Sequence, residues 1–254
     1  MPNILKVQNL SKSFGGVKAV HKVSFELAEG QLLAMIGPNG AGKSTCFNLI
    51  NGQLRPDRGN IIILGKKING YQPRRVWKLG VGRTFQITST FSSMTVLENI
   101  QIAMLSYHRR TKSLFKKAEN LYVDESMDLI RQVGIENQSH RACGVLAYGD
   151  LKRVELAVAL ANKPKLLLMD EPTAGMGPSE RQTLMELTKK IVRSQNIGIL
   201  FTEHDMDVVF NHAERIILLN RGELIAQGTP EEVRKNDKAQ KIYLGSGKAV
   251  KYGN

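Results

Sequence analysis

A glycine-rich loop, set between an apolar run and a segment of helical character, limits this chain to a small set of folds. Residues 37–44 read Gly-Pro-Asn-Gly-Ala-Gly-Lys-Ser, and the apolar run at 31–36 before them is typical of a buried parallel strand. Glycines let such a loop curl so that successive backbone N–H groups face an anion. Residues 45–52 are predicted to form a helix whose N-terminus adds positive partial charge at the loop. Strand, loop and helix together predict a nucleotide-phosphate site.

The loop and a downstream acidic pair are expected to have different chemical roles at the site. The loop fits the pattern G-x-x-x-x-G-K-[ST], which assigns Lys43 to the β- and γ-phosphates and Ser44 to Mg²⁺. Far downstream, the apolar run 166–169 ends in Asp170 and Glu171. A carboxylate at the end of a buried strand suits a hard cation, and a second one suits activation of water. An accidental glycine turn and a merely capped loop are the alternatives, and the presence of both motifs argues against them.

The length and composition of the chain limit the number and class of its domains. The chain has 254 residues, of which 42% are hydrophobic, enough for one large α/β domain or for a core with a smaller subdomain. Its two cysteines show no metal-ligand spacing, and Cys46 is expected to be a small buried apolar residue, which fits a reducing compartment. The sequence shows no secretory apolar core and no run of about 20 apolar residues. We therefore expect that the chain does not cross a membrane by itself.

The formal net charge is +13. The basic residues are spread out in short pairs such as 66–67, 74–75, 109–110, 116–117 and 189–190. Aromatic residues do not interleave with these pairs as stacking platforms for bases would. A solvated face explains the charge best, proximity to anionic lipid comes second, and nucleic acid binding comes last.

The order of predicted elements changes along the chain. Strands are expected at 5–10, 23–27, 31–36, 60–64 and 81–86, followed by helices at 95–110, 120–133 and 150–161. Strands and helices then alternate: strand 166–170, helix 179–194, strand 198–202, helix 206–212, strand 215–220 and strand 224–227. A short helix is expected to begin at Pro230, with a lysine-rich tail after it. The alternation favours a parallel sheet covered by helices.

The order of the motifs resembles that of ATP-binding subunits of ATP-binding cassette (ABC) transporters over nearly the whole chain. Phe14 precedes the loop, and Gln86 ends the strand before the helical part. The segment Leu146, Ala147, Tyr148, Gly149 and Asp150 lies where the family has its Leu-Ser-Gly-Gly-Gln signature. The acidic pair and then Glu203-His204-Asp205 follow in the expected order.

The resemblance implies an α/β fold: a P-loop NTPase (ABC ATPase) core with an N-terminal antiparallel β-subdomain and an inserted all-helical subdomain. It implies one ABC ATP-binding domain over residues 1–254, with the core at about 1–86 and 162–254 and the insert at about 87–161. ATP and Mg²⁺ are the implied cofactors. The implied ATP-binding residues are Phe14, Gly37, Pro38, Asn39, Gly40, Ala41, Gly42, Lys43, Ser44 and Thr45.

The resemblance also assigns roles at the reacting phosphate. Ser44, Gln86 and Asp170 would hold Mg²⁺. Glu171 would be the general base, and His204 would contact the γ-phosphate and orient the water, with Lys43 and Gln86 also in the catalytic set. Without the resemblance, Gln86 is better explained as an ordinary polar residue at a strand end, and His204 as a structural residue. For Phe14, stacking on a base and closing a local turn are equally good explanations.

The signature departs from the family pattern. Ala147 lacks the hydroxyl of the usual serine, while Tyr148 and Asp150 replace a glycine and a glutamine. Gly177 stands where an aspartate is often found. The backbone N–H of Gly149 and the helix N-terminus can still bind phosphate. Since the signature completes the site of a partner chain, we expect a head-to-tail pair with ATP between two ATPase chains, identical or different.

Several segments resemble the ATPases of branched-chain amino acid importers: the Leu-Ala-Tyr-Gly signature and residues 82–86, 94–99 and 243–245. The implied partners are polytopic membrane permease subunits and, indirectly, a substrate-binding protein, with no nucleic acid. The implied location is peripheral, at the cytoplasmic face of the inner membrane. ATPases of urea or amide importers and of lipopolysaccharide export are the alternatives within the family. A soluble ABC ATPase acting on ribosomes or DNA, and a non-hydrolysing regulatory subunit, are weaker hypotheses.

Overall fold

The computed structural model describes residues 2–84, 90–108 and 121–244, with the side chains of residues 243 and 244 left out. Several predictions lie outside these residues. They concern Gln86, the end of the strand expected to reach it, the basic pairs at 109–110 and 116–117, and the part of the lysine-rich tail after residue 244.

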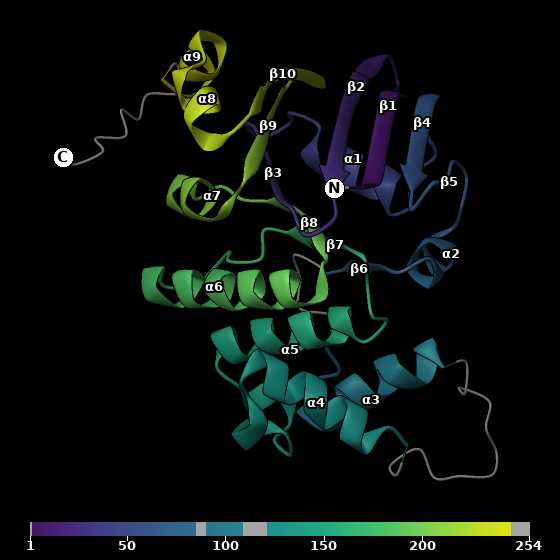
Figure 1. Cartoon of the computed structure of the whole chain (residues 1–254), viewed down its shortest axis with the longest axis vertical. Helices are drawn as coiled ribbons and strands as arrows, with labels where there is room; N and C mark the ends of the chain where they lie inside the picture. The colour runs from purple at the N-terminus through teal and green to yellow at the C-terminus, as the bar shows by residue number, and fades with distance from the viewer. Residues whose placement is uncertain (1, 85–89, 109–120, 245–254) are drawn as a thin grey trace.

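An antiparallel sheet forms the N-terminal part, in the strand order β2-β1-β4-β5 (Figure 1). Its strands are β1 (Asn3–Phe14), β2 (Val17–Ala28), β4 (Arg58–Ile63) and β5 (Lys66–Lys67). The predicted antiparallel β-subdomain is confirmed, but β1 and β2 are longer than the 5–10 and 23–27 expected. The missed residues 11–14 and 17–22 pair as a hairpin, and only Val20 among them is buried, so they carried little hydrophobic signal.

A six-stranded sheet, in the order β10-β9-β3-β8-β7-β6, forms the centre of the molecule. Its strands are β3 (Leu32–Ile36), β6 (Val81–Arg83), β7 (Leu166–Asp170), β8 (Gly198–Thr202), β9 (Arg215–Asn220) and β10 (Glu223–Gly228). The pairs from β9 through β6 are parallel, and β10 pairs antiparallel with β9. Every residue of β3, β7 and β8 is buried, as expected for parallel strands covered on both faces.

The helices occupy two regions (Figure 1). Helices α3 (Val96–Tyr107), α4 (Val123–Val133) and α5 (Tyr148–Leu160) pack together within the predicted insert. The others are α1 (Lys43–Ile50), α2 (Pro73–Lys78), α6 (Pro178–Gln195), α7 (Met206–His212), α8 (Pro230–Lys235) and α9 (Asp237–Leu244). Helix α1 begins at Lys43 and ends at Ile50 instead of spanning 45–52, and α2 and α9 were not predicted. Both missed helices are short, and α9 lies in the segment expected to be tail.

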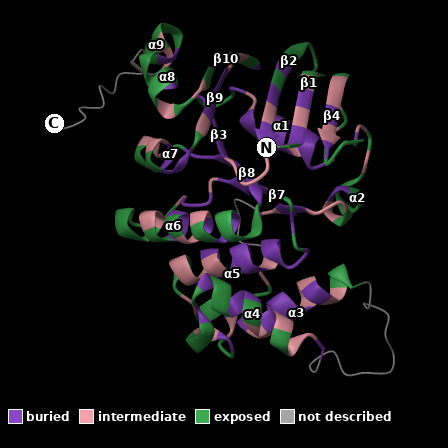
Figure 2. Ribbon diagram, in the orientation of Figure 1, coloured by how far each residue is buried: buried purple, intermediate pink, exposed green. Residues whose placement is uncertain are grey.

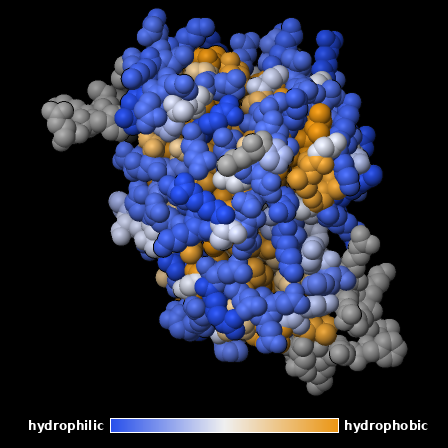
Figure 3. Space-filling view, in the orientation of Figure 1, coloured by the Kyte–Doolittle hydropathy of each residue, from blue (hydrophilic) through white to orange (hydrophobic). Residues whose placement is uncertain are grey.

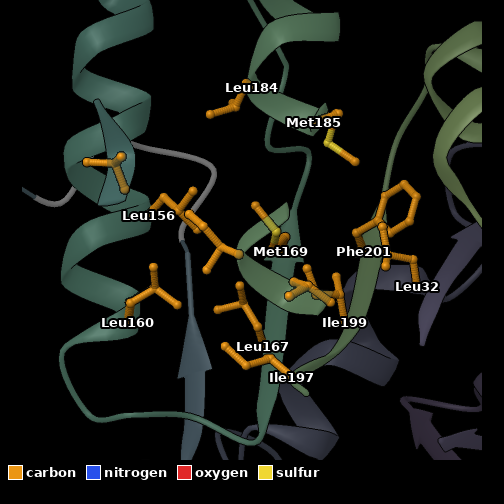
Figure 4. Packing of buried hydrophobic residues seen from close by; sticks show 14 of the residues in the cluster. Leu32, Leu156, Leu160, Leu167, Met169, Leu184, Met185, Ile197, Ile199 and Phe201 are labelled. Carbon is orange, nitrogen blue, oxygen red and sulfur yellow. The ribbon is translucent and has the colours of Figure 1, made fainter. Parts of the chain in front are cut away.

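Two hydrophobic clusters lie on opposite faces of the six-stranded sheet, because successive strand side chains point to opposite faces. Leu32 and Ile36 join the cluster that also holds side chains of α5 and α6 (Figure 4), whereas Leu33 and Met35 join the cluster beneath the antiparallel sheet. Burial follows these layers (Figure 2), and the face drawn in Figure 3 is mainly hydrophilic. Within the described residues, the structure contains no helix that is long and apolar enough to span a membrane.

Candidate functional site

Four neighbouring parallel strands deliver the candidate residues to one edge of the sheet. The loop 37–42 follows β3, Asp170 ends β7, and residues 203–205 follow β8. Strand β6, beside β7, leads to residues 85–89, which lie outside the described part of the chain. Crevices at the carboxyl ends of parallel strands are where open α/β sheets bind ligands.

The phosphate loop needs glycine at two close backbone approaches. Gly37 has φ 151°, and a Cβ there would lie 2.2 Å from the carbonyl oxygen of Leu219. Gly42 has φ 104°, and a Cβ there would lie 2.4 Å from the carbonyl oxygen of Ala19. Gly42 is also the N-cap of α1 and brings no capping side chain, so the first N–H groups of that helix face the loop opening.

Lys43 lies inside the loop, and only 8% of its surface is exposed. Its Nζ donates to the carbonyl oxygens of Gly37 at 2.6 Å and Pro38 at 3.3 Å. Burial lowers the pKa of Lys43, and the negative charges of Glu171 and Asp170 oppose that shift. The amine therefore lies within electrostatic reach of both carboxylates.

The remaining loop residues form the rim of the site. Pro38, Asn39, Gly40 and Ser44 are exposed, Thr45 is half-buried, and Ala41 is buried. The Ala41 N–H donates to the Pro38 carbonyl at 3.1 Å, which closes the turn. The Ser44 hydroxyl is thus on the first turn of α1, accessible to a ligand.

Asp170 is buried and held on both oxygens. Its Oδ1 accepts a hydrogen bond from Thr202 Oγ1 at 2.7 Å, and its Oδ2 lies 3.7 Å from Nη2 of Arg83. A carboxylate and the Ser44 hydroxyl are hard oxygen donors, so the residues present fit Mg²⁺. Among the described residues no group of three or more His, Cys, Asp or Glu side chains is placed to hold a metal.

Glu171 adopts a left-handed backbone conformation, with φ 50°. Its N–H donates to Thr202, to the carbonyl oxygen at 3.2 Å and to Oγ1 at 3.1 Å. Its carboxylate Oε1 lies 2.9 Å from Nε2 of His204, whose side chain is half exposed. Strained backbone held by its surroundings is common at reactive sites. The arrangement offers a fixed carboxylate base with a histidine beside it.

Glu203 forms hydrogen bonds to the segments that carry Glu171 and His204. It is buried, and its carboxylate accepts hydrogen bonds from the N–H of Thr173 at 2.8 Å, from Thr173 Oγ1 at 2.7 Å, and from the N–H of His204 at 3.3 Å. Burial raises the pKa of Glu203. Sequence reasoning assigned no role to Glu203, Thr202 or Arg83, and their positions at strand ends were the only signal.

Phe14 ends β1 and is 47% exposed. The Nζ atom of Lys12 lies 5.5 Å from its ring centroid and 2.8 Å from Oδ1 of Asp57. The hairpin that carries Phe14 reaches the phosphate loop through Ala19, whose carbonyl faces Gly42. An exposed ring beside the loop suits stacking on a nucleotide base.

The signature segment lies elsewhere. Ala147 is the N-cap of α5 without a side-chain hydrogen bond, as its missing hydroxyl requires, and Tyr148, 42% exposed, begins the helix. A Cβ on Gly175 would lie 3.2 Å from the Tyr148 ring, and a Cβ on Gly149 would lie 3.2 Å from the Glu180 carboxylate. The signature thus packs on residues 175–180, not on the phosphate loop of its own chain.

Two other signature residues are the first and last residues of the segment. Leu146 and Asp150 are half-buried, and Asp150 lies in the first turn of α5. Asp150 lines a shallow cleft of about 170 Å³ together with Ala147, Gly149 and Glu180. The uncapped end of α5 opens beside this cleft.

Comparison with protein families gives two matches. A model described as ABC transporter matches residues 20–174. A second model, described as Branched-chain amino acid ATP-binding cassette transporter, matches residues 223–249.

Individual proteins are similar over the whole length. The High-affinity branched-chain amino acid transport ATP-binding protein LivG of Salmonella typhimurium is 36% identical over 252 residues, covering 95% of this chain and 98% of that protein. The solved ADP conformation of MJ1267, an ATP-binding cassette of an ABC transporter, is 32% identical with a TM-score of 0.86, covering 96% of this chain and 100% of that one. The dimeric post-hydrolysis structure of the cassette MJ0796, bound to ADP and Pi, is 26% identical with a TM-score of 0.75, covering 89% of this chain and 98% of that one.

Proposed function

Because the chain belongs to the ABC transporter ATP-binding family, we propose that it is the ATP-hydrolysing subunit of an importer for branched-chain or related amino acids. One observation carries the catalytic part: Glu171 and His204 face each other at 2.9 Å, at the same sheet edge as the phosphate loop. The second family match and the name of the LivG relative support the substrate class.

Each residue of the site has its own role in ATP hydrolysis. The loop N–H groups and Lys43 bind the phosphates, and Phe14 stacks on adenine. Ser44 and Asp170 would hold Mg²⁺ together with Gln86, which lies outside the described residues. A bound Mg²⁺ would supply positive charge to neutralise the phosphate oxygens. Glu171 accepts the proton of the attacking water, and His204 orients that water and contacts the γ-phosphate.

A second ATPase chain completes the site. The signature of one chain packs on residues 175–180 of that chain, and the related cassette MJ0796 has been solved as a dimer. In a head-to-tail pair the uncapped N-terminus of α5 would meet the γ-phosphate bound by the partner. Ala147 leaves this contact to backbone N–H groups, so we expect a weaker signature contact than a serine would give.

Membrane subunits would couple hydrolysis to transport. Exposed apolar side chains support a contact surface: Phe91 is 56% and Val145 is 65% exposed. Their segments are joined, since the N–H of Gly144 donates to the carbonyl of Ser92 at 2.8 Å. Polytopic permease subunits and a substrate-binding protein are the proposed partners, with the chain peripheral at the cytoplasmic face of the inner membrane.

The test is capture of the intact assembly. A tagged Glu171→Gln chain, with ATP, is purified from detergent-solubilised membranes, and the proteins that accompany it are identified. We expect polytopic membrane proteins, a second ATPase chain and, in the same assembly, a binding protein that binds leucine or valine. A binding protein selective for urea would overturn the substrate class. Ribosomal or DNA-processing proteins would overturn the transport assignment while leaving the ATPase site intact.

A further inference from the structure

Arg83 forms an ion pair with Asp170, the carboxylate proposed for Mg²⁺, which lies on the neighbouring strand. Arg83 is the last residue of β6 and pairs in register with Leu168 of β7. Its Nη2 atom lies 3.7 Å from Oδ2 of Asp170, and the two side chains are only 10% and 12% exposed. A buried cation thus lies against the one carboxylate proposed for Mg²⁺.

The same guanidinium has neutral partners on its other side. Nη1 and Nη2 each donate to Oδ1 of Asn48 at 3.1 Å, and Nη1 donates to Oε1 of Gln53 at 3.0 Å. Asn48 belongs to α1, the helix that follows the phosphate loop, and Gln53 comes shortly after that helix. These amide oxygens accept three hydrogen bonds from the guanidinium, and none of the three involves Asp170.

The charge of Arg83 is permanent. Burial lowers the pKa of Arg83 and Asp170 opposes the shift, but a guanidinium stays protonated in proteins because its ordinary pKa lies far above neutral pH. The positive charge beside Asp170 is therefore constant. A divalent cation that binds Asp170 must therefore share the carboxylate with Arg83 or displace it.

Arg83 also stands at the start of the segment that contains Gln86. The next residue, Thr84, donates its N–H to the carbonyl of Leu168 at 2.9 Å, and residues 85–89 follow. Arg83 is only three positions from Gln86 in the sequence.

We propose that Arg83 is a positioning residue that competes with Mg²⁺ for Asp170 and is retained by Asn48 and Gln53 when Mg²⁺ binds with ATP. The inference rests on the proposed function, since it takes Asp170 as the metal carboxylate. A purely structural arginine that orients Asp170 would have the opposite effect, because its loss would weaken metal binding. The sign of the change therefore decides between the two roles.

The test measures Mn²⁺ binding in the presence of ATP, by electron paramagnetic resonance of free Mn²⁺, in a Glu171→Gln parent that does not turn over. Arg83→Gln keeps a polar side chain but removes the charge, and we expect it to tighten Mn²⁺ binding about three- to tenfold. Arg83→Lys keeps the charge, and its affinity for Mn²⁺ should be close to that of the parent. Asn48→Ala removes one alternative acceptor and should weaken Mn²⁺ binding.

Controls separate this effect from a change in net charge or in folding. Arg131→Gln, on the exposed face of α4, makes the same charge change far from the site and should leave Mn²⁺ binding unchanged. ATP affinity in EDTA should be equal in the parent and in Arg83→Gln. If Arg83→Gln fails to fold, as judged by circular dichroism, the direction of the change in Asn48→Ala still tests the proposal.

Three results would overturn the proposal alone: unchanged or weaker Mn²⁺ binding in Arg83→Gln, tighter binding in Arg83→Lys to the same extent, or tighter binding in Asn48→Ala. A parent that binds ATP but no Mn²⁺ would instead overturn the metal site of the proposed function, and this inference with it.

Discussion

Nε2 of His204 lies 2.9 Å from Oε1 of Glu171. The two residues follow neighbouring parallel strands, β8 and β7, so the sheet itself sets their separation. Glu171 is fixed further by its N–H bonds to Thr202, and His204 by its N–H bond to Glu203. A base whose backbone is bonded to the neighbouring strand has its geometry set before substrate arrives, which is what efficient proton transfer requires.

Replacement of Glu171 by glutamine tests this base. We expect Glu171→Gln to lower the ATPase rate by about 10²- to 10⁴-fold, because the amide cannot accept the proton of the attacking water. ATP affinity should be unchanged, since the phosphate loop is untouched. Steady-state phosphate release and equilibrium ATP binding measure the two quantities. Glu223→Gln, exposed on β10, is the matched control, and hydrolysis at the parental rate in Glu171→Gln would refute the assignment.

Phe14 is expected to contribute to affinity and not to chemistry. Phe14→Ala should weaken ATP binding about 5- to 150-fold, because stacking of a base on an aromatic ring is worth about 1–3 kcal/mol. Phe14→Tyr should bind ATP as the parent does. Phe91→Ala removes an equally exposed phenylalanine outside the site and should leave ATP affinity unchanged. Equal affinities for Phe14→Ala and the parent, measured by titration calorimetry, would assign Phe14 to the turn alone.

The sequence predicted the parallel strands well because their signal is local. Residues 166–170 and 198–202 are uninterrupted apolar runs with a polar residue at the end, and the structure places both as β7 and β8 with the same bounds. The family matches confirm the resemblance inferred from the motif order. The roles of the site residues remain predictions, since neither the fold nor the matches test them.

The contacts that sequence reasoning missed are non-local. Arg83 meets Asp170 only because β6 and β7 are neighbours in the sheet, and the two residues are far apart in the chain. Thr202 bonds to Asp170 for the same reason, across β7 and β8. Helix α2 was missed because six residues carry too little periodicity.

Trp77 offers an optical probe of the junction between core and insert. It lies on α2, just before β6, and its ring meets that of Tyr107 at the end of α3, with centroids 6.2 Å apart at 85°. It is the chain's one tryptophan. If ATP binding moves the insert, this edge-to-face contact changes and the emission of Trp77 should shift when Mg²⁺–ATP is added to Glu171→Gln. Tyr107→Phe should keep the shift and Tyr107→Ala should lose it, with ATP affinity equal in both; an unchanged spectrum in the parent would mean that α2 and α3 move as one.

His212 predicts how the stability of the fold depends on pH. The side chain is buried between α7 and α6, with Nε2 2.7 Å from Oε1 of Gln182 and Nδ1 3.4 Å from Oε1 of Glu186. Burial lowers the pKa of His212; Glu186 opposes the shift and Lys189 adds to it. The folded protein thus binds this proton less readily than the unfolded chain, whose histidine titrates near 6.5.

The stabilising contribution of neutral His212 is complete above about pH 6.5 and declines as pH falls below that value toward the lowered pKa. We therefore expect the free energy of unfolding to decrease between pH 7.5 and 5.5, and His212→Gln to reduce that decrease. Urea unfolding at both pH values measures the difference, and comparison with the parent removes the contribution of every other titrating group. His140→Gln, on an exposed turn, is the control and should keep the parental pH dependence. If His212→Gln kept it as well, the attraction of Glu186 would balance the effect of burial, and the pKa of His212 would be the same in the folded and unfolded chains.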